Sequence, residues 1–139
     1  MYVLDTNVIS ELRKKSLGRA APSVVAWADL APPETRYICS ITVMELEMGI
    51  FPLERRDPPQ AAMLRDWLSN QVMPSFAERI LPIDEAAASA CARMMYPRTR
   101  PLRDALIAAA TQVRNFTLVT RNIKDFQDLP VRLINPWEI

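Results

Sequence analysis

The sequence predicts a single α/β domain in which helices flank a twisted, mainly parallel sheet. Two observations lead to this fold class. Short apolar segments of strand type alternate along the chain with longer segments of helical type, which is the order expected of parallel strands joined by helical crossovers. The length of 139 residues fits one domain whose interior can bury carboxylates between packed layers. We therefore expect one domain over residues 1–139, without repeats or linkers.

Five segments have the short apolar composition of strands. They are Tyr2–Asp5, Arg36–Ser40, Arg79–Ile83, Thr117–Thr120 and Val131–Ile134. The segments between them have the composition of helices. The expected helices are Asn7–Lys15, Ala21–Leu30, Ile41–Phe51, Ala61–Met73, Asp84–Met95 and Leu102–Arg114, followed by a helical turn at Lys124–Leu129. Proline should interrupt helices, so Asp57-Pro58-Pro59 predicts a breaker and Pro74 predicts a stop or kink.

Composition excludes several classes of enzyme. The chain has no histidine, which removes Ser-His-Asp and Cys-His catalysis, His-based ribonuclease chemistry and the usual zinc sites. Its two glycines, Gly18 and Gly49, cannot form a P-loop or a dinucleotide fingerprint. Cys39 and Cys91 are far apart in sequence and are expected to be buried, reduced thiols. Carboxylates, hydroxyls, amides, lysine and arginine remain as catalytic groups.

The charge pattern provides no general attraction to polyanions. The formal net charge is +1, so a nucleic acid would have to be held by a local basic patch. Arg13, Lys14 and Lys15 are basic residues in the last turn of an expected helix, where they complement the helix dipole. The chain enters an apolar strand directly after Met1, without a signal peptide, and lacks a run of about 18 apolar residues. We expect a cytoplasmic protein without membrane contact.

Four acidic residues lie beside apolar segments and are candidates for a shared site. Asp5 ends the first strand, and Asp125 follows the strand Thr117–Thr120. Glu45 lies one turn into the helix after the second strand, on its inward face, and Asp104 begins a later helix. Ligand sites of parallel α/β folds lie beyond the carboxyl ends of the strands. All four acids can therefore reach one edge of the sheet.

Each acid taken alone also has a structural explanation. Asp104 in a first helical turn complements the helix dipole, Asp125 can cap a helical turn, and Asp5 can be an ordinary turn residue. Glu45 is harder to explain in this way, because glutamate favours exposed surfaces. The joint placement of the four acids favours a shared site over four separate structural roles.

Converging carboxylates would predict a site for a hard divalent cation. Carboxylates that crowd together repel, and some would take up protons at neutral pH without a cation. Oxygen ligands without histidine or cysteine suit Mg²⁺ or Mn²⁺. Such an ion can activate water and neutralise a phosphodiester. Hydrolysis of a nucleic-acid backbone is the reaction that fits this chemistry.

Several motifs together resemble one known family. They are YVLDTNVISEL at residues 2–12, SITVMEL at 40–46, DALIAAAT at 104–111, TLVTRNIKDF at 117–126 and LINPW at 133–137. In this order and spacing they are similar to PIN-domain ribonucleases, and in particular to the VapC toxins and their FitB-like branch. The resemblance extends over nearly the whole chain. It implies a PIN-like three-layer sandwich, in which helices cover both faces of a mainly parallel sheet.

The resemblance also implies a function and a set of site residues. PIN domains bind Mg²⁺ or Mn²⁺ in an acidic pocket and cleave RNA with a metal-activated water, so this chain would be the endoribonuclease toxin of a toxin-antitoxin system. By matching motif, the metal-binding and catalytic acids would be Asp5, Glu45, Asp104 and, as a more variable fourth, Asp125. The residues that would hydrogen-bond these carboxylates or metal-bound water are Thr6, Asn7, Thr120 and Asn122.

The same resemblance implies partners. VapC-type toxins are usually homodimers that a small cognate antitoxin inhibits by inserting a peptide near the acids. The antitoxin carries a DNA-binding domain, so contact with DNA would be indirect. The expected substrate is RNA, with tRNA among the candidates.

The chain departs from the family at one turn and carries an additional basic segment. Many relatives have a His-Gly pair just before the strand that begins here at Thr117, while this chain reads Arg114-Asn115-Phe116-Thr117. Asparagine can adopt the left-handed conformation that often ends a helix, so the turn is expected to persist. Arg98, Arg100 and Arg103 precede Asp104. They would hold RNA phosphates or, alternatively, form a solvated basic turn.

Two other functions stay open. An acid at a strand end also occurs in receiver domains and in haloacid-dehalogenase-like phosphatases, where an aspartate accepts a phosphoryl group. Asp5-Thr6-Asn7 lacks the second acid that such phosphatases carry two residues later, and no lysine follows the last strands as in receivers. A non-catalytic PIN-like module that only binds RNA or a partner is the remaining alternative. Intact acids at all four positions argue against it.

Overall fold

The computed structural model describes residues 1–139 and contains one five-stranded parallel sheet with the strand order β3-β2-β1-β4-β5. The strands are β1 (Tyr2–Leu4), β2 (Arg36–Cys39), β3 (Ile80–Leu81), β4 (Thr117–Val119) and β5 (Arg132–Ile134). All five expected strands are confirmed, with their ends moved by one or two residues. β1 is central, with β2 on one side and β4 on the other. The direction of the strand order therefore reverses at β1, the kind of position where parallel sheets bind ligands.

Helices occupy most of the remaining chain. They are α1 (Thr6–Arg13), α2 (Pro22–Leu30), α3 (Ser40–Ile50), α4 (Leu53–Arg56), α5 (Pro58–Trp67), α6 (Met73–Ser75), α7 (Glu85–Met94), α8 (Leu102–Gln112) and α9 (Ile123–Phe126). Two 3₁₀ turns lie at Lys14–Leu17 and Pro33–Thr35, and a π-helical turn at Leu68–Val72 joins α5 to α6. The expected α/β class and the main helices are confirmed, while α4 was not expected.

One expected interruption is corrected by the structure. Asp57-Pro58-Pro59 does not break a helix but begins one: the Asp57 carboxylate accepts a hydrogen bond from the Gln60 amide at 3.3 Å, and both prolines lie in the first turn of α5. Amide groups in a first turn have no partner within the helix, so proline costs little there. The helix thus starts three residues before Ala61. The expected stop near Pro74 is confirmed, since α6 ends at Ser75.

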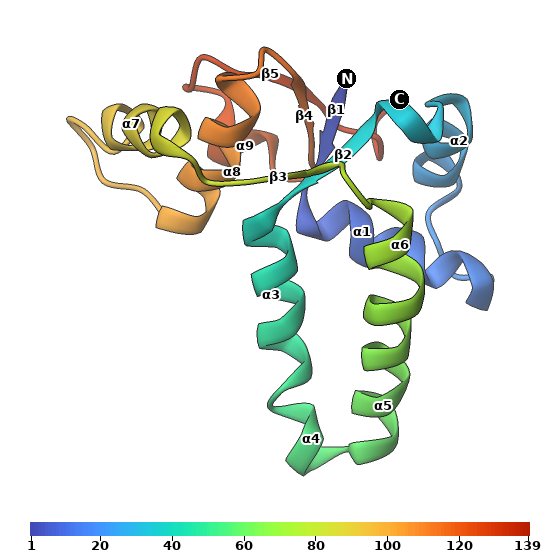
Figure 1. Ribbon diagram of the computed structural model, residues 1–139. Coiled ribbons are helices and arrows are strands. Elements are labelled where there is room, and N and C mark those ends of the chain that lie inside the picture. Colours follow the sequence, from blue (N-terminus) through green and yellow to red (C-terminus); the bar gives the residue numbers. More distant parts are fainter.

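The core has two parts, one on each face of the sheet (Figure 1). Successive residues of a strand point to opposite faces, and β1 shows this directly. Val3 packs with buried residues of α7 and α8, whereas Leu4 packs with residues of α1, α2, α3 and the α5–α6 segment. This arrangement is the expected three-layer sandwich. Cys39 and Cys91 are buried free thiols, as predicted.

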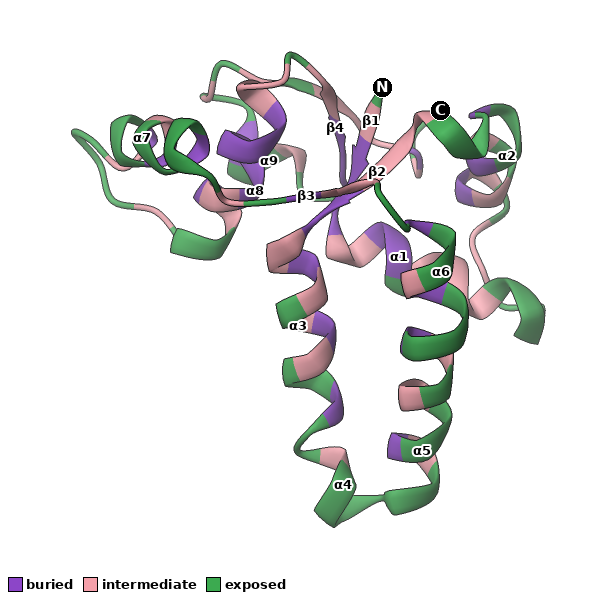
Figure 2. Cartoon of the chain, in the orientation of Figure 1, coloured by how far each residue is buried: buried purple, intermediate pink, exposed green.

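Two helices extend away from the sheet. α3 and α5 run side by side beneath it, joined at the far end by α4, so that they form a projecting hairpin (Figure 1). Exposed residues dominate at its tip (Figure 2). None of the helices is long and apolar enough to cross a membrane.

Candidate active site

Asp5 lies at the carboxyl end of the central strand and begins α1. It is only 5% exposed. One carboxylate oxygen accepts the Thr6 amide at 2.8 Å, while the other accepts the Thr120 hydroxyl at 2.7 Å and the Asn7 amide group at 3.3 Å. Burial raises the pKa of Asp5 above its ordinary value, although the bonds from Thr120 and Thr6 act in the opposite direction. A buried carboxylate is therefore held in a fixed orientation at the strand end.

Glu45 faces inward from α3, as expected. α3 begins at Ser40, directly after β2, so Glu45 lies near the same sheet edge as Asp5. The Thr6 hydroxyl donates to Glu45 Oε1 at 2.6 Å, and it also lies 3.1 Å from the Thr42 hydroxyl. Thr6 thus fixes Glu45 with its side chain while its backbone amide binds Asp5. One residue of α1 connects two of the four acids.

Asp104 lies in the first turn of α8 and is half-buried. The pKa of Asp104 is raised to about 6, first by burial and then by nearby carboxylates. Those carboxylates are Asp5, Asp125 and Glu45. Because like charges on these three acids raise its pKa, the three lie within electrostatic reach of Asp104. The structure therefore brings together the acids that the sequence placed at one sheet edge.

Asp125 occupies a more open position than the other three acids. It lies in α9, the short helix after β4, and its side chain is exposed. The turn before α9 is anchored to the site, because the backbone amide of Asn122 donates to the Thr120 hydroxyl at 3.0 Å. Asn122 contributes this backbone bond, and its side chain makes no capping bond to α9.

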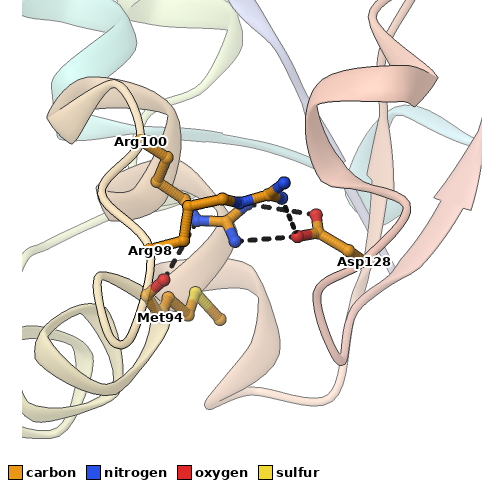
Figure 3. Close-up of polar contacts among 4 residues, drawn as sticks. All are labelled: Met94, Arg98, Arg100 and Asp128. Atoms are coloured by element: carbon orange, nitrogen blue, oxygen red, sulfur yellow. Dashed lines mark hydrogen bonds and ion pairs between the residues drawn. The ribbon is translucent and has the colours of Figure 1, made fainter.

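The three arginines considered in the sequence separate into two groups. Arg103 reaches the site, where its guanidinium lies 3.6 Å from Glu45 Oε2 and contacts the sulfur of Met48. Arg98 and Arg100 point instead to Asp128, beyond α9 (Figure 3). Only Arg103 therefore provides a positive charge directly beside the acids.

The donor chemistry of the site fits a hard divalent cation. All candidate ligand atoms are carboxylate oxygens, the type that Mg²⁺ and Mn²⁺ prefer. The side chains do not form a closed cluster of three acidic ligands. Repulsion among them nevertheless adds to burial in raising the pKa of Asp104, and a bound cation would remove that repulsion. Of the four acids, only Glu45 has a basic side chain as an ion-pair partner.

Two residues of the site region were not expected from the sequence. Thr42 is fully buried beside Thr6. Its position three residues before Glu45, on the same helix face, could have indicated it. Asp128 pairs with Arg98 and Arg100 across 30 and 28 residues of sequence. No local pattern predicts a pair over such a separation.

Comparison with known proteins agrees with the fold. Residues 2–131 match the PIN domain family. The chain belongs to the PIN-domain family. VapC ribonuclease Y4jK of Sinorhizobium fredii is 37% identical over 145 residues, and Toxin FitB of Neisseria gonorrhoeae is 37% identical over 143 residues. Each alignment covers 99% of this chain and 99% of the relative.

A solved structure extends the likeness to three dimensions. The structure of FitAB bound to an IR36 DNA fragment contains a chain that matches this PIN domain with a TM-score of 0.87 and 32% sequence identity. The match covers 100% of this chain and 97% of the other. The expected membership of the PIN family, close to the VapC and FitB toxins, is therefore confirmed over the full length of the domain.

Proposed function

We propose that this PIN-domain protein is a Mg²⁺- or Mn²⁺-dependent endoribonuclease and the toxin of a toxin-antitoxin module. The observation that carries the proposal is the gathering of four acids at the carboxyl edge of the sheet. Thr6 binds both Asp5 and Glu45, and the charges of Asp5, Asp125 and Glu45 add to burial in raising the pKa of Asp104. Repulsion among these acids is a cost that a structural role does not explain and a bound cation would remove. End-to-end similarity to a named VapC ribonuclease supports the reaction class.

Asp5, Glu45 and Asp104 would hold the cation, with Asp125 as the outer ligand. When bound, the ion lowers the pKa of water and offsets the negative charge of the phosphodiester. The Thr6 hydroxyl donates a hydrogen bond that orients the Glu45 carboxylate, and the Thr120 hydroxyl does the same for Asp5. Rigid orientation of this kind keeps the ligands in place when RNA enters.

Arg103 would hold the substrate. Its side chain is 48% exposed, and its guanidinium is already close to Glu45. A weak ion pair of this length and exposure exchanges readily for a phosphate. The exposed guanidinium could therefore bind an RNA phosphate beside the acids.

The proposed partners are a second copy of the chain and a small antitoxin. FitB is named a toxin, and FitAB was solved on DNA. By analogy, this chain would be inhibited by its cognate antitoxin and would meet DNA only through it. RNA, including folded tRNA, is the proposed substrate.

A cleavage assay tests the proposal. A mixed RNA pool that includes folded tRNAs is incubated with the wild type, Asp5→Asn and Asp104→Asn, in Mn²⁺, Mg²⁺ or EDTA. We expect internal cuts only with a divalent ion. Each substitution should lower the cleavage rate by at least about 100-fold, because removing a metal ligand should reduce activity more than removing a residue that only hydrogen-bonds to a ligand. Asp29→Asn is the matched control, since Asp29 is an exposed acid paired with Lys15.

Two outcomes would contradict the proposal. Cleavage that persists in EDTA, or in both site variants, would exclude a metal-dependent nuclease at these acids. Binding of RNA without any cleavage would favour a non-catalytic PIN module.

A further inference from the structure

A polar clamp joins the loop before α8 to the segment after α9 (Figure 3). Arg100 binds Asp128 through two parallel hydrogen bonds, Nη1 to Oδ1 at 3.1 Å and Nη2 to Oδ2 at 2.9 Å. Its Nε donates to the Met94 carbonyl at the end of α7, at 3.0 Å. Arg98 adds a second ion pair to Asp128. We call these three side chains, Arg98, Arg100 and Asp128, the Asp128 clamp.

Both ends of the clamp lie close in sequence to proposed ligands. Arg100 precedes Asp104 by four residues, and Asp128 follows Asp125 by three. The clamp therefore ties the start of α8, which carries Asp104, to the end of α9, which carries Asp125. No other side-chain hydrogen bond or ion pair joins these two segments.

α9 needs such a restraint because it is short. It has four residues, too few to be a stable helix without tertiary contacts. Its single buried side chain, Phe126, enters the core next to α8. Leu129, on the following segment, is partly buried against the same core. These apolar contacts fix the depth of the turn but are not directional, so a directional polar contact is needed to define its rotation.

The clamp has the properties of a strong ion pair. Exposed ion pairs usually contribute little, but a bidentate arginine–aspartate pair is among the strongest types. The Arg100 side chain is only 12% exposed and is fixed at its Nε by the Met94 carbonyl. The hydrogen bond from Arg100 lowers the pKa of Asp128 to about 2, so Asp128 stays ionised at neutral pH. Arg100 is thus pre-oriented to hold Asp128.

We propose that Asp128 is a positioning residue that, through Arg100, holds α9 so that Asp125 faces Asp104. The proposal rests on the proposed function, because it requires Asp125 to be a metal ligand. Asp128 itself touches neither the cation nor the RNA. Its effect on metal binding passes through Asp125 alone.

A double-mutant cycle tests this dependence. Mn²⁺ affinity is measured by calorimetry, without RNA, for the wild type, Asp125→Asn, Asp128→Asn and the double variant. We expect Asp128→Asn to weaken Mn²⁺ binding by about 10-fold, as for other residues that orient a ligand, and to have no further effect when Asp125 is already replaced. Arg100→Lys keeps the charge but loses the paired hydrogen bonds, so it should also weaken binding.

Controls separate this proposal from the one on which it rests. Asp29→Asn removes a similar exposed acid from the Lys15 pair and should leave Mn²⁺ affinity unchanged. Asp5→Asn should abolish binding, and retention of full affinity in that variant would contradict the proposed function itself. If Asp5→Asn abolishes binding while Asp128→Asn does not weaken it, the clamp has no positioning role. The proposal would also be overturned if Asp128→Asn lowered Mn²⁺ affinity equally in the wild type and in the Asp125→Asn variant.

Discussion

Asp104 resists ionisation in the folded, metal-free protein. Its pKa is raised from 3.8 to about 6, first by burial and then by the charges of neighbouring acids. Between those two pH values the folded state binds a proton that the unfolded state has lost. Stability must therefore fall as the pH rises from about 4 to 6, and the loss is complete above that window.

Replacement by asparagine should remove this loss. Converted fully into free energy of unfolding, the pKa difference corresponds to about 3 kcal/mol. Solvent screening at a half-buried position reduces this to about 1 kcal/mol. In EDTA at pH 7, Asp104→Asn should therefore raise the free energy of unfolding by about 1 kcal/mol, as measured by urea denaturation. At pH 4 the two proteins should differ less. An equal difference at both pH values would show that ionisation of Asp104 is not the cause.

For single residues, the sequence predicted where the acids lie better than it predicted which side chains the arginines contact. The placement of Asp5 and Glu45 follows from the strand ends and from helical periodicity, and the structure has both acids there. Their catalytic role stays a prediction. The direction of Arg98 and Arg100 could not be predicted, because it depends on Asp128, which only the tertiary fold brings close.

At the scale of elements, the end of α8 depends on one backbone conformation. Asn115 has a φ of 58°, the left-handed conformation that the sequence predicted for this turn. This conformation costs most residues with a Cβ about 1 kcal/mol or more. Glycine adopts it without that cost, and asparagine tolerates it because its short polar side chain can hydrogen-bond locally. Asn115→Ala should thus lower the free energy of unfolding by about 1 kcal/mol, and Asn115→Gly should leave it nearly unchanged.

The control for this prediction introduces glycine into a regular right-handed helix. Ala92 is exposed in the regular helix α7, so Ala92→Gly should cost about 1 kcal/mol. Urea denaturation of the three variants gives the comparison. A similar loss for Asn115→Gly and Ala92→Gly would mean that the left-handed turn does not limit the choice of residue at 115.

Other elements show what local patterns cannot decide. Proline predicts an interruption, but Pro58 and Pro59 begin α5 because Asp57 caps the helix. The distinction depends on which residue lies at the cap, not on proline content. α4 has only four residues, which is too short for a periodic pattern to be recognised.

At the scale of the whole molecule, sheet order determines which acids meet. The alternation of elements predicted parallel strands, but many strand orders are compatible with it. The observed order places β1 between β2 and β4. As a result, the ends of these three strands lead to Asp5, Glu45 and Asp125 at one edge. The positions of the acids in the sequence had predicted that these strand ends lie together, because a shared site requires it.

The projecting hairpin should be less stable locally than the sheet. No residue from 51 to 60 is buried, whereas Val3 and Leu4 in β1 are fully buried. Exposed backbone with few apolar contacts opens at a small free-energy cost, and core strands open only on global unfolding. Amide exchange followed by mass spectrometry should therefore show rapid exchange in peptides from 53–60 and slow exchange in β1.

Ligand binding extends this prediction to the site. A cation bound by Asp5, Glu45 and Asp104 stabilises the folded state relative to the unfolded state. Mn²⁺ should slow exchange in β1, which opens only with the whole fold, and leave exchange at 53–60 unchanged, because the hairpin tip opens while the cation stays bound. Asp5→Asn should remove the effect of Mn²⁺ on β1. Equal slowing in both regions would mean that the hairpin and the sheet open as one unit.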